Sequence, residues 1–198
     1  MRSWELNGVT LEFIDEVHLY LADGVILPSI TQILNKRFGN KYDGIDTAVL
    51  QRAASEGTAV HEAIEKLCKT GEVSDLSEVK NFIWLAKQYG FSVINNELPV
   101  VLWVDEKPVA AGRLDMVITL DGEYGLADIK RTSVLDKEYV AYQLNLYRIA
   151  YQQTYKQDIK FLRAIHLRKD VRKFVRIPVN EEMALQLVQE YIKEKNNE

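Results

Sequence analysis

Two carboxylates and a lysine stand in the middle of the chain with spacing that suits a divalent cation. Asp115 follows Gly112 by three residues, and further along Asp128 and Lys130 flank Ile129. In a strand, residues two apart share a face, so the Asp128 and Lys130 side chains point the same way. Two nearby carboxylates repel each other, and a hard cation such as Mg²⁺ or Mn²⁺ relieves that repulsion. A hairpin with solvated charges is the alternative interpretation of the same residues.

Three more side chains could serve this centre from segments with helical spacing. His61 follows Gly57, where the missing side chain permits close approach of the backbone. Gln143 and Tyr147 are four residues apart and share one face of a helix. Taken alone, His61 also fits an ordinary core or surface histidine. A zinc-protease motif is excluded, because Glu65 stands where its second histidine is required.

The elements that must position these residues follow from hydrophobic periodicity and turn residues. Alternating residues predict strands within 10–26, Ser29 caps a helix, and 39–44 forms a loop. Further strands are expected at 91–104, 108–119, 123–130, 159–168 and 172–178. Helices are expected at 46–68, 74–89, 135–155 and 180–195. The helix between two strands must cross the sheet, so we expect an α/β fold with a central mixed β-sheet flanked by helices.

The length of 198 residues favours a single domain, 1–198. We divide it into an N-terminal hairpin and helix (1–45), a core (46–155) and a C-terminal hairpin and helix (156–198). The one cysteine, Cys68, excludes an internal disulfide and any four-thiolate zinc or iron–sulfur site. No apolar run approaches the roughly 20 residues that span a bilayer, and the start has no signal-peptide core. We therefore expect a cytoplasmic protein without a membrane partner.

The charge is unevenly distributed along the chain. The net charge is −4, but residues 156–176 hold eight basic and only two acidic side chains. An acidic body with one basic segment suits a protein that binds metal ions in one place and a polyanion beside it. An ordinary solvated surface has the same composition.

Taken in order, these motifs resemble the PD-(D/E)XK nuclease superfamily. The helical histidine, the Gly-x-x-Asp strand, the Asp-x-Lys strand and the Gln-x-x-x-Tyr helix are most similar to its RecB-type exonuclease branch. The segments 18–34 and 97–100 resemble phage-borne members and the mitochondrial genome maintenance exonucleases. The resemblance covers about residues 18–150. Leu114 stands where the family name has proline, and the single cysteine excludes the iron–sulfur members of the branch.

The resemblance implies a restriction-endonuclease-like core and metal-dependent hydrolysis of DNA. One or two Mg²⁺ or Mn²⁺ ions, without an iron–sulfur cluster, would be held by Asp115, Asp128, the Ile129 carbonyl and His61. Glu97, before the core strands, is a candidate ligand for a second ion, and a surface acid at a strand end is the alternative. The expected activity is that of an exonuclease in phage-type DNA recombination, repair or replication.

The same resemblance assigns roles to the remaining motif residues. Lys130 would orient the attacking water or neutralise charge that builds on the phosphate. Gln143 would position the nucleophile or a phosphate oxygen, and Tyr147 would support it by packing or through its hydroxyl.

Linear DNA, single- or double-stranded, is the expected partner, in a bacterial or phage-infected cell, with a single-strand annealing or helicase protein as a further candidate. The candidate phosphate contacts are Arg131, Arg163, Arg168, Lys169, Arg172 and Arg176. Aromatic candidates for base stacking are Tyr20, Tyr42 and Trp84. A solvated basic hairpin is the alternative interpretation.

Three other classes of protein remain open at this point. A sequence- or structure-specific endonuclease of the same superfamily would share these motifs. A non-catalytic DNA-binding or assembly subunit would have the fold with a degenerate site, although every acidic and lysine position here is filled. A structural α/β protein could match the motifs by accident.

Overall fold

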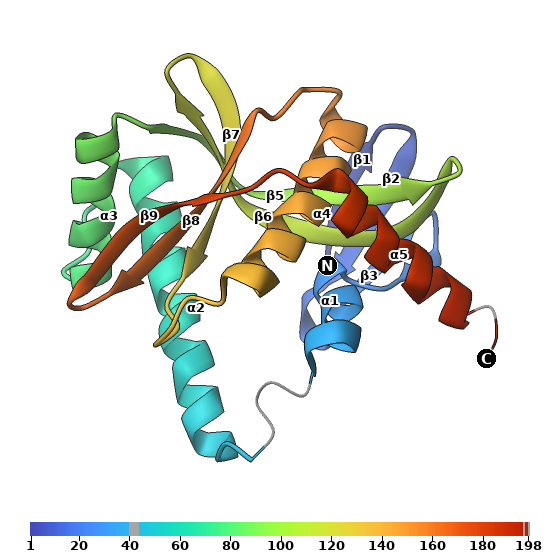
Figure 1. The fold of residues 1–198 in the computed structure, drawn as a ribbon, viewed down its shortest axis with the longest axis horizontal. Helices are drawn as coiled ribbons and strands as arrows, with labels where there is room; N and C mark the ends of the chain where they lie inside the picture. The colour runs from blue at the N-terminus through green and yellow to red at the C-terminus, as the bar shows by residue number, and fades with distance from the viewer. Residues whose placement is uncertain (40–43, 196, 198) are drawn as a thin grey trace.

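The computed structural model describes residues 1–39, 44–195 and 197, which form two sheets and five α-helices (Figure 1). The N-terminal sheet, in order β1-β2-β3-β4, comprises β1 (Arg2–Leu6), β2 (Val9–Ile14), β3 (Leu19–Ala22) and β4 (Val25–Leu27), with the 3-10 turn η1 (Asp15–Val17). The second sheet, in order β5-β6-β7-β8-β9, comprises β5 (Ser92–Val104), β6 (Lys107–Leu120), β7 (Glu123–Lys130), β8 (Phe161–Arg168) and β9 (Val171–Ile177). The helices are α1 (Ile30–Phe38), α2 (Thr47–Thr70), α3 (Ser77–Tyr89), α4 (Lys137–Tyr155) and α5 (Glu181–Lys195).

The five-stranded sheet is mixed, as the sequence predicts. Helix α4 crosses between β7 and β8, which are parallel, and every other neighbouring pair is antiparallel. Helices lie on both faces of this sheet (Figure 1). The fold class is therefore α/β with a mixed sheet flanked by helices.

The bounds of the expected elements agree with the structure within two residues, apart from two differences. The sequence pattern does not predict β1, because only Trp4 and Leu6 are apolar within it. Helix α3 begins at Ser77 rather than at residue 74. The Ser74 hydroxyl accepts a hydrogen bond from the Leu76 amide, which forms a turn before the helix instead. Residues 40–43 of the expected loop, including Tyr42, lie outside the described residues.

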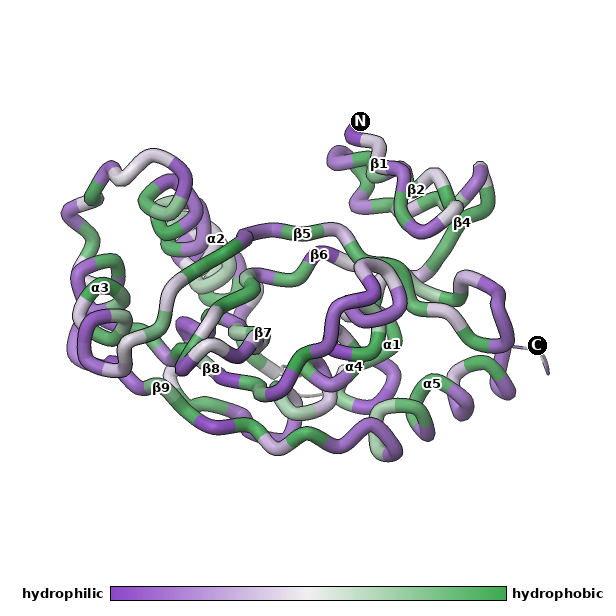
Figure 2. Tube along the Cα trace, turned by 90° about the horizontal axis from the view of Figure 1, so that it is seen from above, coloured by the Kyte–Doolittle hydropathy of each residue, from purple (hydrophilic) through white to green (hydrophobic). Residues whose placement is uncertain are grey.

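Three apolar clusters hold the elements together. One face of the five-stranded sheet packs on α1, α4 and α5, and the other face packs on α2 and α3. The third cluster joins the N-terminal sheet to β5 and β6 through Val101 and Ala111. Figure 2 shows the N-terminal sheet set to one side of the β5–β6 ribbon. No helix within the described ranges has both the length and the apolar character needed to cross a membrane.

The end of α4 covers the outer edge of β5 with polar side chains. Thr154 accepts from the Val101 amide at 3.0 Å and donates to its carbonyl, and Gln153 makes the same pair of bonds with Trp103. The Tyr155 hydroxyl donates to the Pro99 carbonyl at 2.7 Å. These bonds satisfy an edge that would otherwise be open. They also fix the register of α4 relative to β5.

We expect Thr154→Val to destabilise the protein by about 1–3 kcal/mol, because the buried amide and carbonyl of Val101 lose their partner. The measurement is urea unfolding followed by circular dichroism, with Gln51→Ala on the exposed side of α2 as the control. An unchanged midpoint for Thr154→Val would contradict this role of α4.

Candidate active site

The β5–β6 ribbon brings two acidic residues together. Asn96 pairs with Met116 and Leu98 pairs with Leu114, so the register places Glu97 across from Asp115. Glu97 has a φ of 51°, a left-handed conformation that side-chain-bearing residues rarely adopt inside a strand. Strained backbone of this kind is found at functional sites, where the surrounding structure maintains it.

His61 reaches this pair from α2. Its Nε2 lies 3.1 Å from the Ile129 carbonyl oxygen, and its Nδ1 lies 3.5 Å from Asp115 Oδ2. The Ile129 amide donates to the same Asp115 oxygen at 2.7 Å. One ligand atom each of His61, Glu97 and Asp115 lie within 4.8 Å of one another. The structure thus brings together three of the predicted metal ligands.

The structure bears on the roles expected of the Ile129 carbonyl and of Gly57. The Ile129 carbonyl accepts a hydrogen bond when His61 Nε2 carries the proton, so its ligand role stays a prediction that relies on its second lone pair. Gly57 serves no close approach within the described chain, because a Cβ built there would meet nothing within 4 Å.

Asp128 and Lys130 form an ion pair on one face of β7, as strand alternation predicts. Lys130 Nζ lies 2.6 Å from Asp128 Oδ2, and the Asp128 side chain is only 4% exposed. Burial raises the pKa of Asp128, Lys130 opposes that rise, and Asp115 adds to it. Burial lowers the pKa of Lys130, but Asp128 and Asp115 outweigh this effect and raise it above its ordinary value. Lys130 therefore stays charged beside two acids.

Helix α4 contributes the two remaining motif residues. Gln143 is buried, and its Oε1 has no hydrogen-bond partner among the described residues. Tyr147 packs against Gly112, where an added Cβ would lie 3.0 Å from Tyr147 Cε1 and 3.2 Å from its hydroxyl oxygen. Burial raises the pKa of Tyr147 well above its ordinary value, and the charges of Asp115 and Asp128 add to that shift. Tyr147 is therefore neutral and lies near the carboxylates.

Arg113 is a functional candidate that lies outside the defined positions of the sequence motifs. Its Nε lies 2.8 Å from Glu97 Oε2, and its guanidinium lies 5.6 Å from the Phe13 ring centroid. Burial raises the pKa of Glu97, Asp115 adds to the rise, and Arg113 opposes it. Arg113 is two residues from Asp115 on β6, so strand alternation was a usable signal for it.

Arg131 does not project freely beside the site. Its guanidinium pairs with Glu56 at 2.6 Å and with Glu78 at 2.9 Å. It joins α2, α3 and the end of β7, so a phosphate contact would compete with both carboxylates. The expected DNA contact at Arg131 stays a prediction.

The basic hairpin separates into two groups. Arg168 and Lys169 lie at the β8–β9 turn, where their carbonyls accept from Asn81 of α3, and Arg172 lies 4.0 Å from the Trp84 ring centroid. The other group, Arg163 and Arg176, lies away from that turn, near the start of β8 and the end of β9. Because β7 and β8 are parallel and Lys130 pairs with His166, only the first group lies at the same sheet end as Lys130.

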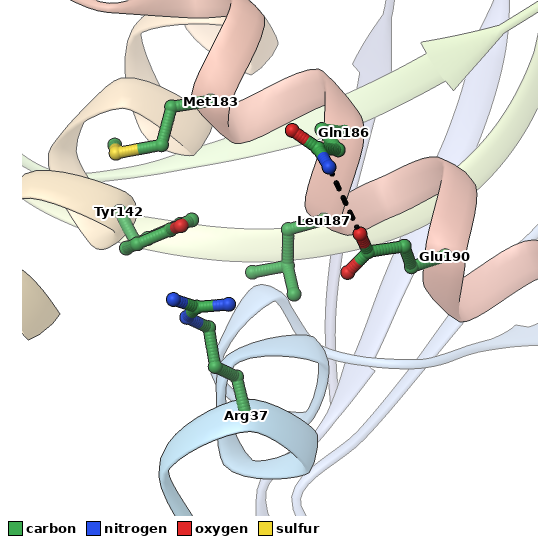
Figure 3. Close-up of a pocket in the computed structure, with 6 residues that line it drawn as sticks. All are labelled: Arg37, Tyr142, Met183, Gln186, Leu187 and Glu190. Carbon is green, nitrogen blue, oxygen red and sulfur yellow. Dashed lines mark hydrogen bonds between the residues drawn. The ribbon is translucent and has the colours of Figure 1, made fainter.

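Two hollows lie outside this cluster. One, of about 220 Å³ between α1, α4 and α5, is lined by Arg37, Tyr142, Met183, Gln186, Leu187 and Glu190 (Figure 3). There the Arg37 guanidinium lies 4.8 Å from the Tyr142 ring centroid, and Gln186 donates to Glu190. The other, of about 500 Å³, includes Arg163 and Arg176. Neither is lined by a predicted catalytic residue.

Comparisons with known proteins give no family. No family model matches the chain, and no curated protein matches it. Among solved structures, one described as "Crystal structure of SSO0001" aligns with a TM-score of 0.48 and 16% identity, covering 83% of this chain and 74% of that one. So weak a likeness carries no inference about this protein.

We expect Lys130→Met to destabilise the protein by about 3–5 kcal/mol at neutral pH, because it leaves the buried Asp128 carboxylate without its cation. The double variant Asp128→Asn/Lys130→Met should recover part of that loss. The measurement is the free energy of unfolding in urea, with the exposed Lys107→Met as the matched control. Equal stability of both lysine variants would contradict the stabilising role of the Asp128–Lys130 pair.

Proposed function

We propose that this protein is a metal-dependent DNA exonuclease of the PD-(D/E)XK type. The observation that carries the proposal is the cluster of His61, Glu97 and Asp115, which lies beside the buried Asp128–Lys130 pair. Acids from three strands, a lysine two residues after one of them and a helical histidine are groups that suit metal-assisted phosphodiester hydrolysis.

The residues present fit a divalent cation. His61 Nδ1 lies 3.5 Å from Asp115 Oδ2, and one ligand atom each of His61, Glu97 and Asp115 lie within 4.8 Å of one another. A cation held between these atoms would offset the repulsion of the two carboxylates. One nitrogen and several carboxylate oxygens suit Mg²⁺ or Mn²⁺. His61, Glu97, Asp115 and Asp128 would hold the ion.

When bound, the ion would lower the pKa of a water molecule and stabilise the leaving oxygen of the phosphodiester. The chain supplies the rest. The Lys130 ammonium holds positive charge next to Asp128, where negative charge builds on a phosphate. The unpartnered Gln143 Oε1 can accept a hydrogen bond from a water and orient it. Tyr147, which packs against Gly112, forms one side of the site.

Two other functions share this fold. A sequence- or structure-specific endonuclease would use the same residues, and the order of motifs from the helical histidine to Gln143 and Tyr147 supports the exonuclease instead. A DNA-binding or assembly subunit would not need a buried aspartate–lysine pair beside a glutamine oxygen that has no partner among the described residues.

The direct test incubates the purified protein with end-labelled linear DNA, single- and double-stranded, and with circular DNA. Each substrate is combined with Mg²⁺, Mn²⁺ or EDTA. We expect metal-dependent shortening from the ends of linear DNA. Asp115→Asn and Asp128→Asn should lower the rate by on the order of 10²–10³-fold, because each removes charge that the site needs.

The matched control is Asp121→Asn, in the exposed β6–β7 turn, which makes the same chemical change outside the site. Cleavage of circular DNA would favour the endonuclease. Intact DNA in every metal, with tight binding to DNA, would favour the non-catalytic subunit and overturn the proposal.

A further inference from the structure

Two arginines face each other across the last two strands of the sheet. Arg163 of β8 pairs in register with Arg176 of β9. Like charges directly opposite each other destabilise a strand pair, so stability does not explain them. Neither side chain forms an ion pair with any described acid. The acid nearest to Arg163 along the chain, Asp158, is paired with Lys160 and Arg148.

The Arg163 guanidinium lies against two aromatic rings. Phe161 packs against Gly125, where an added Cβ would be 2.2 Å from the ring, so the position of Phe161 depends on that glycine. Arg163 lies 5.0 Å from the Phe161 ring centroid and 5.4 Å from that of Phe174. Burial lowers the pKa of Arg163, and the charge of Arg176 adds to the effect. An anion at this position would relieve both penalties.

This pair does not lie with the catalytic candidates. Arg163 pairs in register with Ala127, whose side chain packs on the α2–α3 side of the sheet. Asp128 is the next residue of β7, so its side chain points to the other face. DNA held at Asp128 would therefore not reach the two arginines by a direct path.

The hollow beside the arginines is half apolar and lies at a free edge. It has a volume of about 500 Å³ and is lined by Lys160, Phe161, Arg163, Arg176, Ile177, Pro178 and Val179. Val179 is 44% exposed. Strand β9 is outermost in its sheet, and no backbone hydrogen bond joins it to any described strand other than β8. Hydrophilic and hydrophobic residues are interspersed along it (Figure 2).

We propose that the edge of β9 binds an extended acidic peptide segment of a partner protein. The peptide adds as a strand beside β9, its carboxylates pair with Arg163 and Arg176, and an apolar side chain enters the hollow near Val179. The charge of the site selects an acidic ligand. The apolar lining favours a peptide over a nucleic-acid backbone, which has charged phosphates but no apolar side chain.

The test uses the full chain in EDTA, so that binding is measured independently of any nuclease activity. The probe is a fluorescein-labelled peptide in which glutamate and leucine alternate, followed by fluorescence anisotropy. A peptide of equal length with lysine in place of glutamate and a labelled oligothymidine are the comparison ligands.

We expect the acidic peptide to bind and the basic peptide not to bind. The double variant Arg163→Gln/Arg176→Gln should weaken binding at least tenfold. Val179→Ser should weaken it at least threefold. Lys173→Gln removes one charge from the opposite face of the same strand, and it should change affinity less than threefold.

Three results would overturn the proposal. One is no binding of the acidic peptide by a folded protein. Another is a loss of affinity in Lys173→Gln as large as the loss in the double arginine variant, which would indicate attraction by net charge alone. The third is oligothymidine binding that is tighter than peptide binding and is lost in the double arginine variant, which would identify the hollow as a DNA contact.

Discussion

Crowding of negative charge at one place is the constraint on which this site depends. Glu97, Asp115 and Asp128 come from three neighbouring strands, and the proximity of Asp115 raises the pKa of each of the other two. Each acid also has a compensating group. Arg113 pairs with Glu97, Lys130 pairs with Asp128, and Asp115 accepts from the Ile129 amide while it faces His61. A divalent cation would complete this compensation where ligand atoms of His61, Glu97 and Asp115 lie within 4.8 Å of one another.

The fold keeps these groups together through backbone register rather than through side-chain contacts alone. The β5–β6 pairing places Glu97 across from Asp115, and strand alternation places Lys130 beside Asp128. The polar bonds between the end of α4 and the edge of β5 then determine where Gln143 lies along the same helix. A shift of one residue in the β5–β6 pairing would turn these side chains to the wrong face.

Much of this arrangement is local and could be predicted from the sequence. Hydrophobic periodicity gives the order of the elements, and a spacing of two residues in a strand predicts the Asp128–Lys130 pair. Contacts between distant segments could not be predicted in this way. The pairing of Arg131 with Glu56 and Glu78 joins residues more than fifty positions apart, so no spacing rule reveals it. The same holds for the face on which Arg163 lies, which depends on the parallel pairing of β7 with β8.

The resemblance to nucleases and the geometry of the site both favour a bound divalent cation. The most direct measurement is calorimetric titration of Mn²⁺ into metal-free protein, with Asp115→Asn and the turn variant Asp121→Asn alongside. We expect saturable binding by the wild type and by Asp121→Asn, and at least tenfold weaker binding by Asp115→Asn. Equal affinity in all three proteins, or no binding by the wild type, would contradict a cation site at Asp115.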